Sequence, residues 1–197
     1  MVTHFALLRH AETEWNREKR IQGQQDAPLT SHGRQQAQRW GLALARYELD
    51  HMITSDLGRA SLTGRLINLN LDLPRSEEPR LREQDWGRWA GLNFCDLLKV
   101  KELRAQEKMG WYFRPFEGES RLEVLERSRQ ALVDAAGRLK GKRVLVVTHG
   151  GVIKCLLYRL SRRDFLPEEP PLLEPYRLHW LSYDGRGFQI DRLNEEI

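Results

Sequence analysis

The alternation of apolar and polar stretches along the chain predicts strands that are separated by helices. Apolar runs at 5–8, 51–54 and 71–73 are typical of short buried strands. The stretch Arg143–Val147 is the most strand-like in the chain, because four branched apolar residues follow one another there. The first run ends abruptly in a cationic residue and an imidazole, Arg9 and His10.

Other stretches carry apolar residues at helical spacing. The first predicted helix begins at Thr30 or Ser31, either of which can act as its N-cap. Gly33 lies in its first turn, where we expect a glycine to cost little stability. A later helix opens with a capping box, in which Ser120 is followed by Glu123. The predicted helical ranges are about 30–49, 60–67, 120–139 and 152–160.

Strands that alternate with helices predict an α/β fold, a three-layer α/β/α sandwich with a mostly parallel central sheet. The runs Tyr176–Tyr183 and Phe188–Leu193 flank Asp184-Gly185, which is a strong hairpin signal, so we expect an antiparallel edge at the end of the sheet. The segment at about 92–120 has the character of a lid-like insertion. We expect residues 1–197 to form a single domain.

Composition limits the classes of function. The chain has 40% hydrophobic and 30% charged residues and a net charge of +4, without the basic stripe of a nucleic-acid-binding protein. It has no apolar run of membrane-spanning length and no signal-peptide pattern, and its two cysteines form no disulfide framework. We therefore expect a cytoplasmic protein that acts on a small metabolite, without nucleic-acid or membrane partners. Its oligomeric state, monomer or homodimer, stays open.

Polar residues follow three of the predicted strands. Arg9-His10 follows the first, Ser55 to Arg59 the second and Thr148-His149 the strand at 143–147. Because the carboxyl ends of parallel strands open onto one edge of a sheet, these residues should meet there. Two imidazoles and two guanidiniums in one place are favourable only around a multiply charged anion. Since arginine forks match phosphate oxygens, the pattern predicts a phosphoryl group as the ligand.

Histidine chemistry fits such a ligand. One imidazole can attack phosphorus and form a phosphohistidine, while the other donates to the phosphoryl oxygens in the transition state. The leaving alkoxide needs a proton, and Glu83, in a loop rich in glycine and aromatic residues, is the candidate general acid and then base. Glu12, Glu14 and Asp85 are competing carboxylic acids. The positive pocket needs no metal ion, and we expect no cofactor.

The segment Leu7 to Asn16, Leu-Leu-Arg-His-Ala-Glu-Thr-Glu-Trp-Asn, resembles the signature of the histidine phosphatase superfamily, which includes phosphoglycerate mutases and related phosphatases. Further blocks of the family's pattern follow in the family's order. These blocks are Gln22-Gly23, Asp26 to Thr30, Ser55 to Ala60, Leu81 to Glu83, Gly118 to Ser120 and Val147 to Gly151.

The resemblance implies a role for each matching residue. His10 is the residue that becomes phosphorylated, and Glu83 is the proton donor and then acceptor. Arg9, Arg59 and His149 form the phosphate pocket, Asn16 helps to bind phosphate, and Gln22 with Gly23 belongs to the adjoining substrate loop. From the residues alone, Gln22 could equally be a solvated loop residue. Ala11 stands where the family usually has glycine, and we expect its methyl group to be tolerated.

The family contains mutases and phosphatases. Only 66 positions separate Glu83 from His149, and the mutases resembled here are longer in that region. After Glu83 the chain reads Gln-Asp-Trp-Gly-Arg-Trp-Ala-Gly-Leu, similar to the branch that includes broad-specificity phosphatases and α-ribazole phosphatase. The aromatic residues of the insertion predict a lid that accepts an organic substituent of the substrate. They are Trp111, Tyr112, Phe113 and Phe116.

The sequence therefore predicts a phosphatase that hydrolyses small phosphate monoesters through a phosphohistidine on His10. A cofactor-dependent phosphoglycerate mutase is the first alternative. A non-catalytic module that only binds a phosphorylated ligand is the second, although intact His10, Glu83 and His149 disfavour it.

Overall fold

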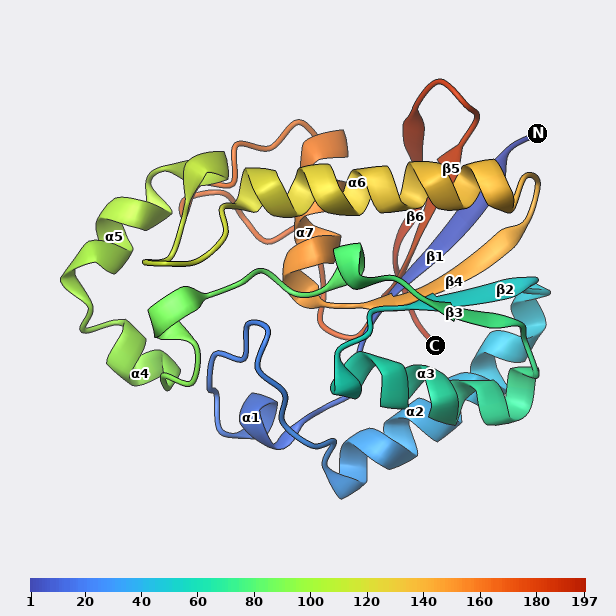
Figure 1. Cartoon of the computed structure of the whole chain (residues 1–197), viewed down its shortest axis with the longest axis horizontal. Coiled ribbons are helices and arrows are strands. Elements are labelled where there is room, and N and C mark those ends of the chain that lie inside the picture. The colour runs from blue at the N-terminus through green and yellow to red at the C-terminus, as the bar shows by residue number, and fades with distance from the viewer.

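The computed structural model describes residues 1–197 and is built on a six-stranded sheet (Figure 1). The strand order is β3-β2-β4-β1-β5-β6. The four strands from β3 to β1 are parallel, whereas β5 is antiparallel to β1 and β6 to β5. The strands are β1 (Thr3–Arg9), β2 (His51–Thr54), β3 (Arg75–Glu77), β4 (Arg143–Thr148), β5 (Leu178–Tyr183) and β6 (Phe188–Glu195).

Helices cover both faces of this sheet, with α6 and α7 on one side and α2 and α3 on the other (Figure 1). None of the helices combines the length and the apolar character needed to cross a membrane. The helices are α1 (Glu14–Arg17), α2 (Ser31–Leu44), α3 (Gly58–Leu71), α4 (Phe94–Leu97), α5 (Lys101–Glu107), α6 (Arg121–Arg138) and α7 (Gly150–Leu160). Four short 3-10 helices complete the chain: η1 (Ala45–Tyr47), η2 (Pro79–Leu81), η3 (Gly87–Trp89) and η4 (Gly110–Tyr112). The structure thus has the predicted three-layer α/β/α architecture with an antiparallel edge.

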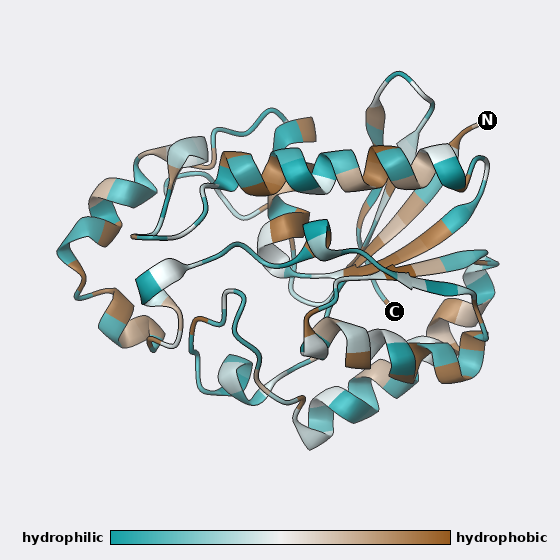
Figure 2. Cartoon of the chain, viewed as in Figure 1, coloured by the Kyte–Doolittle hydropathy of each residue, from teal (hydrophilic) through white to brown (hydrophobic).

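The two faces of β1 belong to two different cores. Phe5 and Leu7 point into the core below α6 and α7, and Ala6 and Leu8 point into the core against α2 and α3. All four side chains are fully buried, and burial of each large one contributes about 1.5–3 kcal/mol. A strand buried on both faces has a continuous apolar sequence, as parallel strands between helical layers do. In Figure 2 the central strands are accordingly mostly brown.

The register of the parallel strands aligns their carboxyl ends. Arg9 on β1 is paired with Thr148 on β4, and Thr54 on β2 is paired with Val147 of the same strand. The residues that follow these three strands therefore emerge side by side, as the sequence predicted.

The insertion at 92–120 forms a projection of its own at one end of the molecule, where α4 and α5 lie away from the sheet (Figure 1). Its buried residues Leu97, Leu103 and Phe113 form a small core together with Trp89 of the preceding 3-10 helix η3. Trp86 packs edge-on against Phe113, with ring centroids 5.6 Å apart. The aromatic residues of this region thus hold the projection together.

Two predicted elements are wrong in their bounds or their place. The expected strand at 71–73 is absent, because α3 continues to Leu71 and ends at Asp72, which has a φ of +48°. The strand of this region, β3, follows Pro74, and its three residues are exposed at the sheet edge, so no apolar pattern indicates it. The helix expected to reach about Leu49 ends at Leu44 and continues only as the 3-10 turn η1.

Gly33 is needed for a close approach between the N-terminus of α2 and the segment that follows β1. An ideal Cβ at this position would lie 2.1 Å from the carbonyl oxygen of Glu12. Thr30, the N-cap of α2, donates to the Glu12 carboxylate over 2.8 Å and fixes the same contact. Our expectation that a glycine here matters little is therefore wrong.

Gly33→Ala should lower the free energy of unfolding by about 1–3 kcal/mol, because the backbone of Glu12 must move to admit the methyl group. Gly137→Ala is the matched control, since Gly137 lies within α6 and no atom lies within 4 Å of its added Cβ. That variant should gain about 0.5–1 kcal/mol from helix propensity. Urea denaturation of both variants measures the difference, and equal effects of the two substitutions would contradict the argument.

Candidate active site

His10 lies directly after β1, and its hydrogen bonds define its protonation. Its Nδ1 is 2.8 Å from the carbonyl oxygen of Ala11, which can only accept, so Nδ1 carries the hydrogen. Nε2 accepts from Nε of Arg59 over 3.3 Å, which requires a lone pair on Nε2. Burial is the main reason why the pKa of His10 lies well below its usual value, and the charges of Arg9 and Arg59 lower it further. The ring is therefore neutral, with an available lone pair on Nε2.

Arg59 is held rigidly beside this ring at the start of α3. Its Nη1 donates to the carbonyl of Gln25 over 2.7 Å and to Asp26 over 2.9 Å, and its Nη2 donates to the carbonyl of Gly23 over 2.7 Å. The Asp26 carboxylate also accepts from the backbone N–H groups of Gly58 and Arg59. The loop that contains Gly23 thus serves to orient the guanidinium.

His149 follows β4 and packs against His10, with ring centroids 5.3 Å apart. Its Nε2 is 2.8 Å from the hydroxyl of Ser55, which itself accepts from the N–H of Leu57. The Ser55 hydroxyl has no other acceptor in the protein, so it donates to Nε2, and the ring hydrogen of His149 lies on Nδ1. This Nδ1 is buried and has no partner. Burial, followed by the charge of Arg59, holds the pKa of His149 well below its usual value.

Glu83 lies in the loop after η2, and its side chain lines the same cavity as His10, which follows β1, and Gly151, which lies at the start of α7 after β4. One carboxylate oxygen accepts from the N–H of Gly151 over 3.2 Å, and the other accepts from the N–H of Gln84 over 2.8 Å. Gly151 leaves room for this contact, because an added Cβ would lie 2.1 Å from Oε1 of Glu83. Glu12, Glu14 and Asp85, the competing acids, do not line the cavity.

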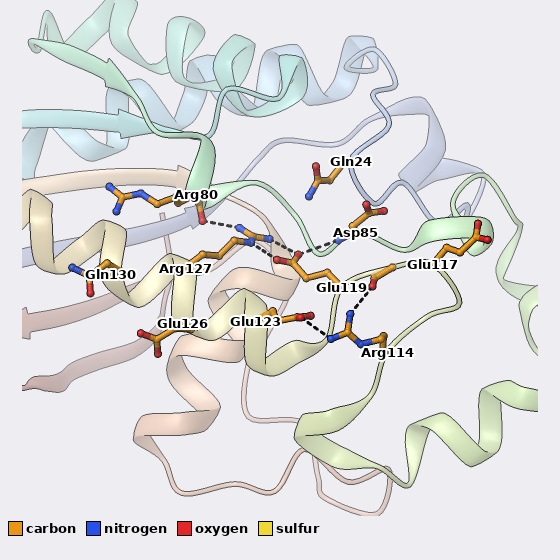
Figure 3. A pocket seen from close by; sticks show the side chains of 11 residues that line it. Gln24, Arg80, Asp85, Arg114, Glu117, Glu119, Glu123, Glu126, Arg127 and Gln130 are labelled. Carbon is orange, nitrogen blue, oxygen red and sulfur yellow. Dashed lines mark hydrogen bonds and ion pairs between the residues drawn. The ribbon is translucent and has the colours of Figure 1, made fainter.

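Arg127 holds the backbone on both sides of Glu83, and its contacts with Arg80 and Glu119 are drawn in Figure 3. It lies on α6 and forms a half-buried ion pair with Glu119, with an Nε–Oε1 distance of 2.6 Å. It also donates to the backbone carbonyls of Arg80 over 2.6 Å and Glu83 over 3.1 Å. The N–H of Asp85 donates to the Glu119 carboxylate in turn. Arg127 and Glu119 therefore fix the backbone on either side of Glu83.

A cavity of about 400 Å³ contains nearly all the residues that the sequence singled out. Arg9, His10, Asn16, Gln22, Gly23, Arg59 and Glu83 line it. His149 is fully buried beside His10 and is not part of the lining itself.

The orientations of the flanking polar groups suit an anion in this cavity. The carbonyl oxygen of Asn16 accepts from the N–H and hydroxyl of Thr13, which leaves its amide hydrogens free. Arg9 packs under the ring of Tyr176, 5.4 Å from its centroid, and its buried Nε has no partner. Gln22 is buried rather than solvated, and its Oε1 is also without a partner.

The sequence failed to indicate several lining residues. Arg20, Arg121 and Lys154 bring further positive charge to the cavity, and Trp86 and Phe165 are its aromatic components. The four lid aromatics that we expected to receive the substrate do not line it. Instead, they hold the insertion together or face solvent: Trp111 packs on Phe165, Phe113 is buried in the insertion core, and Tyr112 and Phe116 are exposed. The cavity is consequently more polar than predicted.

Comparison with known proteins agrees with this arrangement. A sequence model described as the histidine phosphatase superfamily (branch 1) matches residues 5–196. The chain is 39% identical over 153 residues to a protein named probable phosphoglycerate mutase GpmB of Escherichia fergusonii, which covers 77% of this chain and 71% of that protein.

Two solved structures extend the likeness to the whole fold. Bacillus stearothermophilus YhfR is similar with a TM-score of 0.89 and 32% identity, covering 99% of this chain and 98% of that one. A mycobacterial glucosyl-3-phosphoglycerate phosphatase, described in complex with VO3, is similar with a TM-score of 0.86 and 26% identity. That match covers 98% of this chain and 99% of the other.

The buried, neutral histidines predict a loss of stability in acid. An unfolded histidine binds a proton below about pH 6.5, whereas the lowered pKa values of His10 and His149 keep both rings neutral in the folded state. The free energy of unfolding should therefore fall from pH 7 to pH 5, by up to about 1.4 kcal/mol per pH unit for each histidine. His10→Asn should make this slope shallower in urea denaturation. His32→Asn, at an exposed position on α2, should not, and identical slopes in all three proteins would contradict the burial argument.

Proposed function

The chain belongs to the histidine phosphatase superfamily, and on this basis we propose that it is a phosphatase that hydrolyses small phosphate monoesters through a phosphohistidine on His10. The observation that carries the proposal is the protonation of His10. Its Nδ1 hydrogen is committed to the Ala11 carbonyl, and its Nε2 lone pair lies beside the guanidinium of Arg59 in the cavity. An imidazole in this state is a nucleophile without prior loss of a proton.

In the first proposed step, Nε2 of His10 attacks phosphorus and the bond to the leaving alkoxide breaks. Arg9, Arg59 and the amide of Asn16 hold the phosphoryl oxygens, and the N–H of His149 donates to them as charge redistributes. Glu83 in its protonated form gives its proton to the leaving oxygen, so that an alcohol departs. The positive side chains supply the charge that a metal ion supplies in other phosphatases.

In the second step, water attacks the phosphohistidine. The Glu83 carboxylate, formed in the first step, takes a proton from this water, and the N–P bond breaks to restore neutral His10 and release inorganic phosphate. The hydrogen bond from Gly151 N–H keeps the carboxylate facing the reacting group in both steps. The substrate is then a small phosphorylated metabolite.

A phosphoglycerate mutase is the second candidate, and the name of the 39% identical relative favours it. A mutase uses the same first step but returns the phosphoryl group to a hydroxyl of the substrate. Two observations favour the phosphatase: the short distance in sequence from Glu83 to His149 and the likeness over the whole chain to a structure named as a phosphatase.

His10→Asn should lower the rate of p-nitrophenyl phosphate hydrolysis at least about 1,000-fold, because the variant has no nucleophile. The wild-type protein, quenched during turnover of radiolabelled substrate, should carry an acid-labile phosphoryl label that the variant lacks. His32→Asn serves as the control. Hydrolysis by His10→Asn at the wild-type rate would refute the mechanism. A 2- and 3-phosphoglycerate interconversion that greatly outpaces phosphate release would identify a mutase, and binding without turnover or label would identify a non-catalytic module.

Arg127→Met should weaken proton donation by Glu83, because it releases the backbone that Arg127 holds. The loss should depend on the leaving group: about tenfold or more in kcat/KM for an alkyl phosphate, whose alkoxide needs a proton, and much less for p-nitrophenyl phosphate. The ratio of the two values, measured on one sample, does not depend on the fraction of folded protein.

Arg80→Met is the matched control for this variant. The Arg80 side chain lines the same groove as Arg127 but points away from the Arg127 guanidinium (Figure 3), and it pairs with Glu78 and Asp134 rather than with the backbone of Glu83. It should leave the substrate ratio unchanged. A uniform loss for both substrates in Arg127→Met would show that Arg127 serves stability alone.

A further inference from the structure

The cavity holds more positive charge than a single phosphoryl group requires. Arg9 and Arg59 flank His10, yet Arg20, Arg121 and Lys154 line the same cavity, whereas Glu83 is the only carboxylic acid among the lining residues. The charge of Arg20 has a partner within the protein, since Arg20 pairs with Glu18 over 3.1 Å and also donates to the carbonyl of Gly91. Arg121 and Lys154 have no such acidic partner.

Arg121 is the first residue of α6, and its guanidinium is fixed without being neutralised. It lies between two aromatic rings, 4.2 Å from the centroid of Phe113 and 4.1 Å from that of Phe165. Nη1 donates to the carbonyls of Gly110 and Phe165, both over 3.0 Å. The Nε and Nη2 groups form no hydrogen bond within the protein, and neither is sealed from solvent. One edge of the guanidinium fork thus stays available, and this edge has the geometry that binds an oxyanion with two parallel N–H bonds.

Lys154 lies on α7, one helical turn after Gly151, and therefore on the same face as the residue that donates to Glu83. Its ammonium group forms no hydrogen bond or ion pair within the protein. Its side chain is exposed and lines the cavity, so the ammonium group is available to a ligand. Desolvation is the main cause that lowers the pKa of Lys154; the carboxylate of Glu83 opposes it, and the charges of Arg9 and Arg121 lower the pKa further. An anion near Lys154 and Arg121 would relieve this repulsion.

The position of these two cations identifies the part of the substrate that they face. Glu83 marks the side from which the leaving alcohol departs, and Lys154 follows Gly151, the residue that holds Glu83, by one turn of α7. The carbon skeleton beyond the leaving oxygen must extend on this side, away from His10 and Arg59. The aromatic lid residues that would favour an apolar substituent do not line it.

We propose that Arg121 and Lys154 form a second anion subsite, so that the preferred substrates are phosphate monoesters whose alcohol carries a further anionic group. A carboxylate fits the free edge of Arg121 through two N–H bonds, and Lys154 closes the site as a point charge. A second phosphoryl group offers the same chemistry. This inference rests on the proposed phosphatase activity and adds the class of leaving group to it.

Aryl phosphates that differ only in one substituent test the subsite. The wild-type protein should hydrolyse 4-carboxyphenyl phosphate with a kcat/KM about 10- to 100-fold above that for 4-carbamoylphenyl phosphate, in which a neutral amide replaces the carboxylate. Lys154→Met should reduce this ratio about tenfold or more. Arg121→Lys, which keeps the charge but not the fork, should reduce it less. Phenylene 1,4-bisphosphate, in which a second phosphoryl group replaces the carboxylate, should also exceed the amide in kcat/KM, because the subsite binds either anion.

Lys140→Met, at an exposed position outside the cavity, is the control and should leave the ratio unchanged. Absence of any preference for an anionic substituent in the wild-type protein, or an unchanged ratio in Lys154→Met, would overturn the subsite. Failure of the wild-type protein to hydrolyse either aryl phosphate would instead refute the phosphatase activity itself. The two failures are thereby distinguished.

Discussion

The parallel pairing of β1 with β4 is the constraint on which the rest of the site depends. Its register places Arg9 beside Thr148, so the next residue of each strand is a histidine, and the two rings lie 5.3 Å apart. β2 pairs with the other side of β4 and delivers Ser55 to His149 and, after it, Arg59 to His10. A slip of one residue in either register would turn alternate side chains to the opposite face and separate these groups. The apolar faces of the strands, each buried in its own core, prevent that slip.

The residues that this pairing brings together lower the stability of the folded state. Buried imidazoles lose hydration, and the adjacent guanidiniums repel one another in the absence of an anion. The chain compensates with fixed hydrogen bonds rather than with acidic neighbours inside the cavity. Carbonyl groups of Gly23 and Gln25 hold Arg59 together with the Asp26 carboxylate, which lies outside the cavity lining, and two carbonyls with two aromatic rings hold Arg121. The carbonyl and aromatic partners of Arg121 fix the direction of its guanidinium without cancelling its charge, which keeps that charge available for a ligand.

The sequence was sufficient to predict the fold class and the strand ends that meet, because buried parallel strands have continuous apolar sequences and their termini must share one edge. It did not reveal β3, which is exposed and short, nor the close contact that requires Gly33. Lys154 and Arg121 also escaped prediction. A lone cation at the start of a helix, or one between apolar helical residues, resembles any solvated side chain until the packing shows that it has no partner. The aromatic run at 111–116 led to a wrong prediction for the converse reason: Trp111 and Phe113 pack on aromatic residues elsewhere in the chain, and Tyr112 and Phe116 are exposed.

Phosphate recognition and substrate selection come from different parts of the chain, and this separation follows from their physical requirements. The groups around His10 follow directly from strands of the sheet, where the backbone is least free to move, and phosphoryl transfer needs that rigidity. Arg121 comes from the first turn of α6 and Lys154 from the second turn of α7, and the short hydrogen-bonded loop of Glu83 lies between these two regions. A change at position 121 or 154 could therefore alter which alcohol is released without disturbing His10. The proton is transferred where the two regions meet, which is why Glu83 is held from the α7 side by Gly151 and from the α6 side by Arg127.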